Sequence, residues 1–134
     1  MTPEMQAMLA AESFVVVGAS RDTGKYGFLV YRSVKAAGKT VFPVNPRAAE
    51  VDGDHCYPSL SDLPQKPEVA VMVVPPPMTE AAVAECARLG IRQIWMQPGA
   101  ESAAAIEACR ENDIEVVAGG PCLMVLLRTA KFQN

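Results

Sequence analysis

Residues 14–27 read FVVVGASRDTGKYG, and the expected architecture follows from this stretch. Its first four residues are aromatic or β-branched without polar alternation, which is typical of a strand buried on both faces of a parallel sheet. Gly18 then permits a sharp turn, and small residues keep the connection narrow before a helical pattern begins. Ser20, Asp22 or Thr23 is expected to cap that helix. Because such a strand needs helices above and below it, the stretch predicts an α/β fold of three layers.

The turn after this strand also predicts a binding site for an anion. A helix start presents unpaired backbone N–H groups and the positive end of the helix dipole, and both favour a phosphate. Arg21 and Lys25 add two cations within the same loop. The alternative is that these two side chains, together with Arg47, are solvated surface charges.

The rest of the chain repeats this alternation of apolar runs and amphipathic segments. Further strands are expected at 40–44, 69–74, 91–96 and 114–118, and helices at 2–11, 28–38, 79–89, 103–112 and 122–130. Thr2 and Ser102 are expected to cap two of these helices. Segment 47–58 is interpreted as an excursion with at most a short strand, 59–63 as one helical turn, and the prolines at 75–77 as a loop. The pattern predicts a doubly wound, Rossmann-like, mainly parallel sheet of five strands with helices on both faces.

Length and composition favour one domain, taken here as residues 1–134. The chain is 50% hydrophobic, and a chain of this size buries roughly two thirds of its unfolded surface. Its formal net charge is −3 and its pI about 5.1, whereas a nucleic-acid surface needs a basic excess. The longest apolar run is far shorter than the ~20 residues of a membrane span. We therefore expect neither nucleic-acid binding nor membrane association.

The cysteines and the single histidine argue against a metal site. Cys56, Cys86, Cys109 and Cys122 show no CxxC spacing, and His55 has no second histidine as partner, so no metal ligands are assigned. No secretory signal precedes the cysteines, and reduced, mostly buried thiols indicate a cytoplasmic protein. No paired acid and base carboxylates emerge, so no catalytic residue is assigned.

The glycine loop departs from two common nucleotide-binding motifs. Tyr26 occupies the place of the Ser or Thr that binds magnesium in a Walker A loop, which removes the main support for nucleotide hydrolysis. Ser20 replaces the second glycine of GxGxxG. The second strand ends in Asn45-Pro46-Arg47 rather than in the Asp or Glu that holds the ribose of NAD, and Arg47 suits a phosphate on a ribose.

Five short motifs, in this order, resemble the small stand-alone CoA-binding proteins, which are related to the CoA-binding Rossmann domain of the succinyl-CoA synthetase α subunit. The motifs are VVVGASRDTGKYG, VFPVNP, VMVVPPP, IWMQPGA and GGPCLM. Together they cover nearly the whole chain. The resemblance implies a protein that binds coenzyme A or an acyl-CoA noncovalently at the carboxyl ends of the parallel strands, with the phosphates on the loop 18–27.

The resemblance also implies which residues contact the ligand. Phosphate contacts are implied for Gly18, Ala19, Ser20, Arg21, Lys25 and Tyr26, and adenosine contacts for Asn45, Pro46, Arg47, Val74, Pro75 and Pro76. Contacts towards the pantetheine arm are implied for Gln97, Gly99 and Ala100. Cys122 is included because a helix start lowers the pKa of a thiol, and such a thiolate can form a mixed disulfide with the CoA thiol. The alternative is that Cys122 is a small packed residue.

Other functions stay open beside CoA binding. The synthetases carry a phosphorylated histidine in a second domain, whereas His55 lies in the excursion after the second strand, so ligase chemistry is not expected. An NAD(P)-binding, oxidoreductase-like protein or an acyl-CoA-using enzyme would need a placed acid, base or nucleophile, and an enzyme is the less favoured hypothesis. An interaction protein with a vestigial nucleotide site is the third reading. A homodimer or an unidentified protein partner is compatible with each.

Overall fold

A computed structural model describes residues 1–131; residues 132–134, which the sequence analysis includes in the domain, lie outside the described residues. The elements in chain order are α1 (Pro3–Ala10), β1 (Ser13–Val17), α2 (Tyr26–Ala36), β2 (Thr40–Val44), β3 (Glu50–Val51), β4 (Asp54–His55), the short 3₁₀ helix η1 (Leu60–Asp62), β5 (Val69–Met72), α3 (Pro76–Leu89), β6 (Gln93–Met96), α4 (Ala103–Glu111), β7 (Glu115–Val117) and α5 (Leu123–Lys131). None of these helices is long and apolar enough to cross a membrane.

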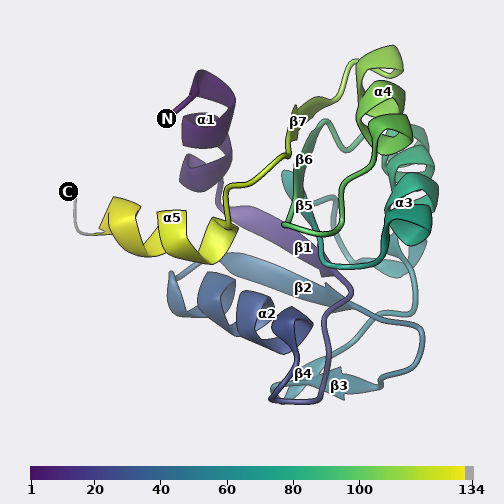
Figure 1. Ribbon diagram of the computed structural model, residues 1–134. Helices are drawn as coiled ribbons and strands as arrows, with labels where there is room; N and C mark the ends of the chain where they lie inside the picture. The colour runs from purple at the N-terminus through teal and green to yellow at the C-terminus, as the bar shows by residue number, and fades with distance from the viewer. Residues whose placement is uncertain (132–134) are drawn as a thin grey trace.

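Five parallel strands form the main sheet in the order β2-β1-β5-β6-β7 (Figure 1). An α-helix precedes each of β2, β6 and β7, whereas β5 is reached through the segment that holds β3, β4 and η1, and the helices cover both faces of the sheet. The predicted doubly wound, Rossmann-like fold is confirmed. The remaining two strands, β3 and β4, form a separate antiparallel hairpin.

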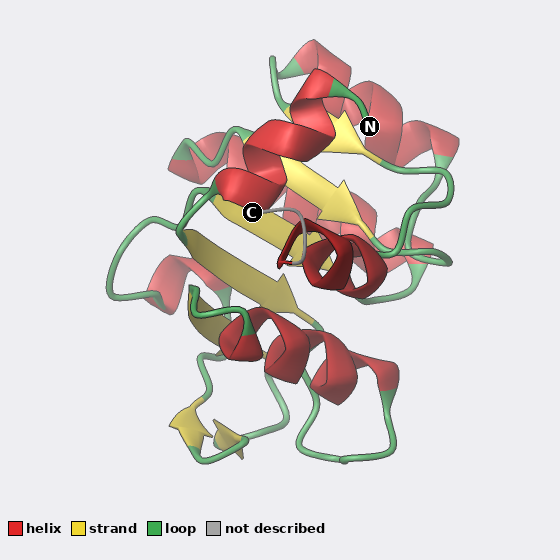
Figure 2. Ribbon diagram, turned by 90° about the vertical axis from the view of Figure 1, so that its left-hand side faces the viewer, coloured by secondary structure: helices red, strands yellow, loops and turns green. Residues whose placement is uncertain are grey.

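Two hydrophobic cores, one on each face of the sheet, hold the layers together. Phe14 and Val16 of β1 belong to the core beneath α1, α2 and α5, whereas Val15 belongs to the core beneath α3 and α4. The two views show this division of the helices (Figures 1 and 2). All four residues of β5 are buried. A strand covered on both faces needs no polar alternation, which is why its sequence shows none.

Helix α3 begins inside the proline run that the sequence analysis interprets as a loop. Pro75 is the N-cap, and Pro76 is the first helical residue. The prediction was wrong because the first turn of a helix leaves its N–H groups unpaired, so a proline there loses no hydrogen bond, and its fixed φ suits the helix start. Strand β5 correspondingly ends at Met72, two residues before the predicted end at 74.

Two of the predicted helix caps are confirmed and one is wrong. Thr2 Oγ1 accepts a hydrogen bond from the Met5 N–H at 3.2 Å, and Ser102 Oγ accepts one from the Ala105 N–H at 3.0 Å. The N-cap of α2 is Lys25, which makes no capping hydrogen bond with its side chain. None of the three expected residues, Ser20, Asp22 and Thr23, therefore caps α2.

The excursion between β2 and β5 contains two short strands rather than at most one. Asp52 and Gly53 join β3 to β4, with φ of 52° and 80°. Two-residue turns with both residues at positive φ suit tight hairpins, and Asp-Gly is among the sequences they favour. The dipeptide was therefore a usable signal that the sequence analysis did not take into account.

Candidate functional site

A cavity of about 940 Å³ opens at the carboxyl ends of β1, β2, β5 and β6. Strands β1 and β5 are neighbours in the sheet, but α2 after β1 covers one face and α3 after β5 covers the other. The two connections therefore diverge and leave a crevice between them. In open α/β sheets, ligands bind at such a switch point.

Thirteen of the sixteen candidate site residues from the sequence analysis line this cavity. They are Gly18, Ser20, Lys25, Tyr26, Asn45, Pro46, Arg47, Val74, Pro75, Pro76, Gln97, Gly99 and Ala100. The other three lie outside the lining: Ala19 is fully buried, Arg21 lines a second cavity, and Cys122 is hydrogen-bonded to Tyr26 and Gln97.

Six further residues line the cavity that are not among the sixteen candidate site residues. They are Val17, Gly27, Val44, Val73, Met78 and Pro98. Met78 is 50% exposed although its side chain is long and apolar, and it belongs to the first turn of α3. Because the sequence analysis placed a loop over the prolines, it did not expect this turn at the edge of the cavity.

The loop between β1 and α2 is held by its own polar side chains. Ser20 Oγ accepts a hydrogen bond from the Asp22 N–H at 3.1 Å, and Asp22 Oδ1 accepts one from the Gly24 N–H at 3.0 Å. These side chains stabilise local turns instead of capping α2. Within residues 1–131, the N–H groups of Tyr26 and Gly27 make no hydrogen bond. The start of α2 is therefore able to donate to an anion.

Two glycines let the loop, β5 and α2 approach one another closely. Gly18 has a φ of +99°, and a Cβ atom there would overlap the backbone oxygen of Val73. A Cβ atom on Gly27 would overlap the backbone oxygen of Gly18. The contact between these two glycines brings the start of α2 against the end of β1, so both are required for the shape of the cavity wall.

Lys25 and Arg47 place two positive charges on the cavity wall. Both residues are exposed, and neither forms an ion pair within the part of the chain that the structure describes. Asn45 holds the wall between them: its Nδ2 donates to the Ala19 carbonyl at 2.8 Å, and its Oδ1 accepts from the Arg47 N–H at 2.8 Å. Asn45 therefore ties the end of β2 to the first loop.

Cys122, Tyr26 and Gln97 form a polar cluster beside the cavity. The Tyr26 hydroxyl lies 3.0 Å from Cys122 Sγ, and the buried Gln97 donates from Nε2 to that hydroxyl at 2.8 Å and to the sulfur at 3.4 Å. Gln97 Oε1 accepts from the Leu123 N–H at 2.8 Å, which fixes the orientation of the amide. Burial raises the pKa of the Cys122 thiol, but hydrogen bonds from Tyr26, from Gln97 and from backbone N–H groups of α5 lower it overall.

Arg21 and His55 line the second cavity, of about 550 Å³, together with Ala49, Glu50 and Gly53. It lies between the first loop and the β3–β4 hairpin. The His55 ring packs edge-to-face against the ring of Tyr57, with 4.6 Å between the ring centroids. Within residues 1–131, no three His, Cys, Asp or Glu residues are grouped so that they could hold a metal ion.

Comparison with known proteins gives the family. A family model described as "CoA binding domain" matches residues 12–128. The ADP-forming acetate–CoA ligase II of Archaeoglobus fulgidus is 36% identical over 92 residues, which are 67% of this chain and 14% of the ligase. The ADP-forming acetate–CoA ligase I of the same organism is 30% identical over 115 residues, which are 85% of this chain and 17% of the ligase. The chain thus spans less than a fifth of the length of these relatives.

Among solved structures, a hypothetical protein from Pyrococcus horikoshii OT3 is similar over almost its full length. The TM-score is 0.90 and the sequence identity 29%, and the match covers 96% of this chain and 92% of that chain. The family model runs from the residue before β1 to the middle of α5, so it includes the whole main sheet and every segment that lines the larger cavity. This chain is a member of the CoA binding domain family.

Proposed function

We propose that this protein binds coenzyme A, free or as an acyl-CoA, in the cavity at the carboxyl ends of the parallel strands. Membership of the family supports CoA binding in general, and the position of the ligand in this cavity is part of the proposal. The observation that carries the proposal is the combination of three features in one crevice of about 940 Å³. The crevice has a helix start with unpaired N–H groups, two cations, and an apolar surface of valine and proline side chains. The N–H groups and the cations suit the phosphates of the ligand, and the apolar surface suits its adenine ring.

In the proposed arrangement the phosphates lie over residues 18–27, which are the loop after β1 and the first residues of α2. Lys25 and the N–H groups at the start of α2 neutralise them through charge-assisted hydrogen bonds. Gly18 and Ser20, which line the cavity, contribute close backbone contacts, whereas Ala19 is fully buried and accepts a hydrogen bond from Asn45. The Arg21 side chain lines the second cavity instead, so only its backbone takes part.

The adenosine lies between the segments that follow β2 and β5. Pro46, Val74, Pro75 and Pro76 offer the adenine ring an apolar surface, and Arg47 offers a cation to a phosphate on the ribose. Asn45 acts mainly by holding this wall in place, because its side-chain amide is already engaged by the first loop and by the Arg47 N–H.

The pantetheine arm runs along the segment after β6, past Gln97, Gly99 and Ala100. Its sulfur points towards the polar cluster, so that Cys122 contacts the thiol or thioester. Gln97 is fully buried and hydrogen-bonded at both ends of its amide. It therefore keeps Cys122 and the phenol of Tyr26 at fixed positions beside the arm.

Isothermal titration of the reduced protein with CoA, dephospho-CoA, NAD and ATP in parallel tests the proposal. CoA is expected to bind, and loss of the 3′-phosphate is expected to weaken binding because Arg47 loses its partner. Tighter binding of NAD than of CoA would instead support the oxidoreductase-like hypothesis. Binding of none of the four would support an interaction protein with a vestigial site.

A single lysine gives the sharpest test of the phosphate position. Lys25→Ala is expected to weaken CoA binding by about 1.5–3 kcal/mol, the range for a hydrogen bond to a charged group. Lys66→Ala is the matched control. Lys66 precedes β5 and lies near Gly90, which precedes β6, so it is at the amino ends of the strands, away from the cavity at their carboxyl ends. Equal CoA affinity in the two variants would remove Lys25 from the site.

A further inference from the structure

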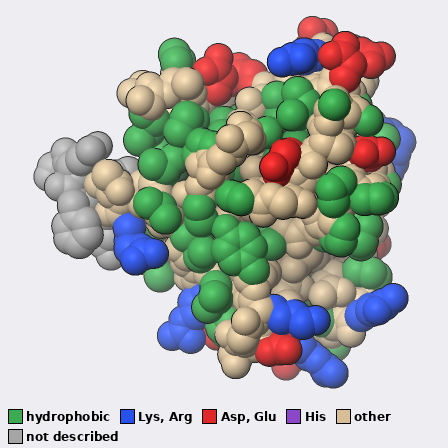
Figure 3. All heavy atoms as spheres, viewed as in Figure 1, with side chains coloured by type: hydrophobic (Ala, Val, Ile, Leu, Met, Phe, Trp, Pro, Cys, Tyr) green, Lys and Arg blue, Asp and Glu red, His purple; other side chains and the backbone are tan. Residues whose placement is uncertain are grey.

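An apolar patch lies on the face formed by α2 and α5, and most of it is not explained by the cavity. The large hydrophobic side chains that are exposed there are Tyr26 (37%) and Leu29 (45%) of α2 and Val125 (53%) of α5. The two helices pack against each other. Figure 3 shows hydrophobic side chains gathered over α5 and α2, with basic side chains at the left and lower edges of the group. These three residues are termed the α2–α5 patch.

Each helix of the patch carries an arginine on the same exposed face. Arg32 lies three residues after Leu29, and Arg128 lies three residues after Val125, a spacing that puts side chains on one face of a helix. The Arg32 side chain is 66% exposed, and its ion pair with Asp52 is long, at 3.9 Å. Such exposed pairs contribute little, so Arg32 is available to a partner.

We propose that the α2–α5 patch docks an acidic amphipathic helix of another protein. An apolar stripe on that helix covers Tyr26, Leu29 and Val125, and Glu or Asp residues beside the stripe pair with Arg32 and Arg128. Aromatic side chains and arginine are enriched at protein interfaces, where they supply much of the binding energy. The charge of the occupant is argued from a contrast, because the chain has a net charge of −3 yet places arginines at this patch.

Two other occupants fit the patch less well. A second copy of this chain, docked on the same patch about a two-fold axis, would bring like-charged arginines of the two copies together. An anionic lipid surface would attract the arginines but would repel the chain as a whole, because its net charge is −3. A docked helix of another protein, unlike a lipid surface, contacts only the patch, so the acidic side chains elsewhere on this chain lie farther from that helix.

The proposal does not depend on what the cavity binds. Tyr26 also lines the cavity, so a docked helix would lie beside the cavity mouth. The other members of the patch, Leu29 and Val125, lie outside the cavity lining and serve to test docking separately from ligand binding.

The first experiment uses two synthetic helical peptides of about five turns, or about 18 residues. Both carry the same leucine stripe, flanked by glutamates in one peptide and by lysines in the other. Each is titrated into the isotope-labelled full chain and followed by NMR. The glutamate peptide is expected to shift the backbone amides of α2 and of the first turns of α5, and the lysine peptide is expected to leave them unchanged.

Variants with a matched control test the two parts of the patch. Leu29→Glu and Arg32→Glu are each expected to weaken binding of the glutamate peptide about tenfold, and Arg32→Glu is expected to gain affinity for the lysine peptide. Arg110→Glu is the control: its side chain is 69% exposed, and it lies on α4, on the other face of the sheet. This change is expected to have no effect. Circular dichroism confirms that each variant is folded.

Several results would overturn the proposal. Binding of neither peptide at about 1 mM, or equal binding of both, excludes recognition through charge complementarity. Dimerisation that is lost in Leu29→Glu, measured by analytical ultracentrifugation, assigns the patch to a second copy. Binding to phosphatidylglycerol vesicles that is lost in the same variant, with no binding of the glutamate peptide, assigns it to lipid.

Discussion

Cys122 differs from the other cysteines because of what surrounds its sulfur. Burial raises the pKa of the Cys86 thiol to about 12 and that of Cys109 to about 11. Burial acts on Cys122 in the same direction, but the hydrogen bonds from Tyr26 and Gln97 reverse the outcome and leave its pKa below the ordinary value. One residue type thus has opposite reactivity at different positions of one small fold.

Alkylation should therefore distinguish Cys122 in the folded, reduced protein. A lowered pKa means a larger thiolate fraction between about pH 7 and 8, so iodoacetamide is expected to modify Cys122 before the buried cysteines. Tyr26→Phe removes a hydrogen bond to the sulfur, so the alkylation rate should fall and its pH profile should move to higher pH. Mass spectrometry of the modified peptides over a pH series measures both. An identical profile in wild type and variant would contradict the assigned cause.

Gly18 and Gly38 allow backbone strain to be separated from overlap. Both have positive φ, at +99° and +82°, but a Cβ atom would meet backbone only at Gly18 and nothing within 4 Å at Gly38. Gly38→Ala is expected to cost about 1–3 kcal/mol from strain alone. Gly18→Ala should cost more, because Val73 has to move as well. Urea denaturation gives both values, and equal losses would show that the overlap at Val73 is relieved without cost.

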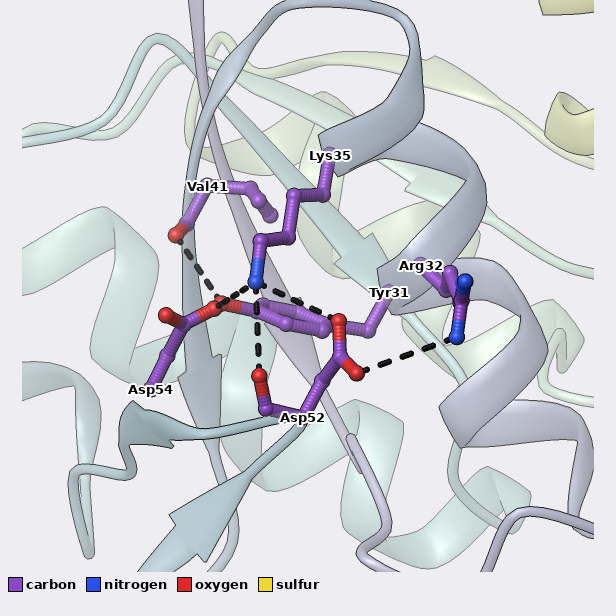
Figure 4. Close-up of polar contacts among 6 residues, drawn as sticks. All are labelled: Tyr31, Arg32, Lys35, Val41, Asp52 and Asp54. Atoms are coloured by element: carbon purple, nitrogen blue, oxygen red, sulfur yellow. Dashed lines mark hydrogen bonds and ion pairs between the residues drawn. The ribbon is translucent and has the colours of Figure 1, made fainter.

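At the scale of elements, α2 holds the β3–β4 hairpin through a polar cluster (Figure 4). The Tyr31 hydroxyl donates to Asp54 Oδ2 at 2.6 Å, and Lys35 Nζ lies 2.7 Å from the same oxygen and 3.2 Å from Asp52 Oδ2. Tyr31 is 1% exposed, whereas the side chain of Lys35, which pairs with both Asp52 and Asp54, is 41% exposed. The hairpin is thus attached by one buried hydroxyl and by ion pairs at the surface.

Removing that hydroxyl should loosen the attachment without creating a cavity. Tyr31→Phe is expected to lower the free energy of unfolding by about 1 kcal/mol, because water can reach Asp54 and replace part of the lost hydrogen bond. The measurement is urea denaturation at neutral pH. Tyr57→Phe is the matched control, since the Tyr57 hydroxyl makes no hydrogen bond to the described part of the chain. An equal loss of unfolding free energy in both variants would mean that the hydrogen bond from the Tyr31 hydroxyl does not stabilise the fold.

The same cluster makes a prediction about pH. The hydrogen bond from Lys35 and then that from Tyr31 hold the pKa of Asp54 below its ordinary 3.8, so this contribution is present above that pH and is lost as pH falls through the lowered pKa. Burial, and then the bond to Asp54, raise the pKa of Tyr31 above its ordinary 10.0. Its contribution is therefore present below pH 10 and is lost as pH rises beyond it.

A comparison of wild type with Tyr31→Phe isolates the alkaline part. Above about pH 10 the tyrosine ionises in the unfolded chain but not in the folded one, so wild type loses stability that the variant does not have. The difference in unfolding free energy between the two proteins should shrink as pH rises. A difference that stays constant to about pH 11 would contradict the raised pKa of Tyr31.

The elements differ in how far their sequence specified them. The buried runs of β1 and β5 were predictable because burial on both faces removes polar alternation. The start of α3 was not, because a proline run suits a loop and a first helical turn equally well. The cap of α2 was missed for a different reason: Ser20 and Asp22 are good caps by type, yet each is occupied by a nearer N–H within its own loop.

At the scale of the whole molecule, the residues that line the cavity were predictable as far as they stand at strand ends. Parallel strands bring all their carboxyl ends to one edge, so Asn45, Pro75 and Gln97 could be expected together from the strand order alone. Met78 could not, because its place depends on where α3 begins. Contacts between elements carry information that the local pattern of each element lacks.

Because the cavity is lined by segments after four different strands, a bound ligand should stabilise the whole fold rather than one part. If CoA binds the folded chain but not the unfolded chain, a CoA concentration one hundred times its Kd should add about 2.7 kcal/mol to the free energy of unfolding. Trp95 is the only tryptophan, is fully buried, and donates to the Pro121 carbonyl at 3.1 Å, so its fluorescence reports unfolding.

The matched variants turn this stabilisation into a test of the site. Without CoA, Lys25→Ala and Lys66→Ala should unfold at similar urea concentrations, because both side chains are on the surface. At the CoA concentration used for wild type, Lys66→Ala should gain the full stabilisation, whereas Lys25→Ala should gain about 1.4 kcal/mol or less if its Kd rises about tenfold or more. An equal gain in both variants would mean that CoA stabilises the fold from a position that Lys25 does not touch.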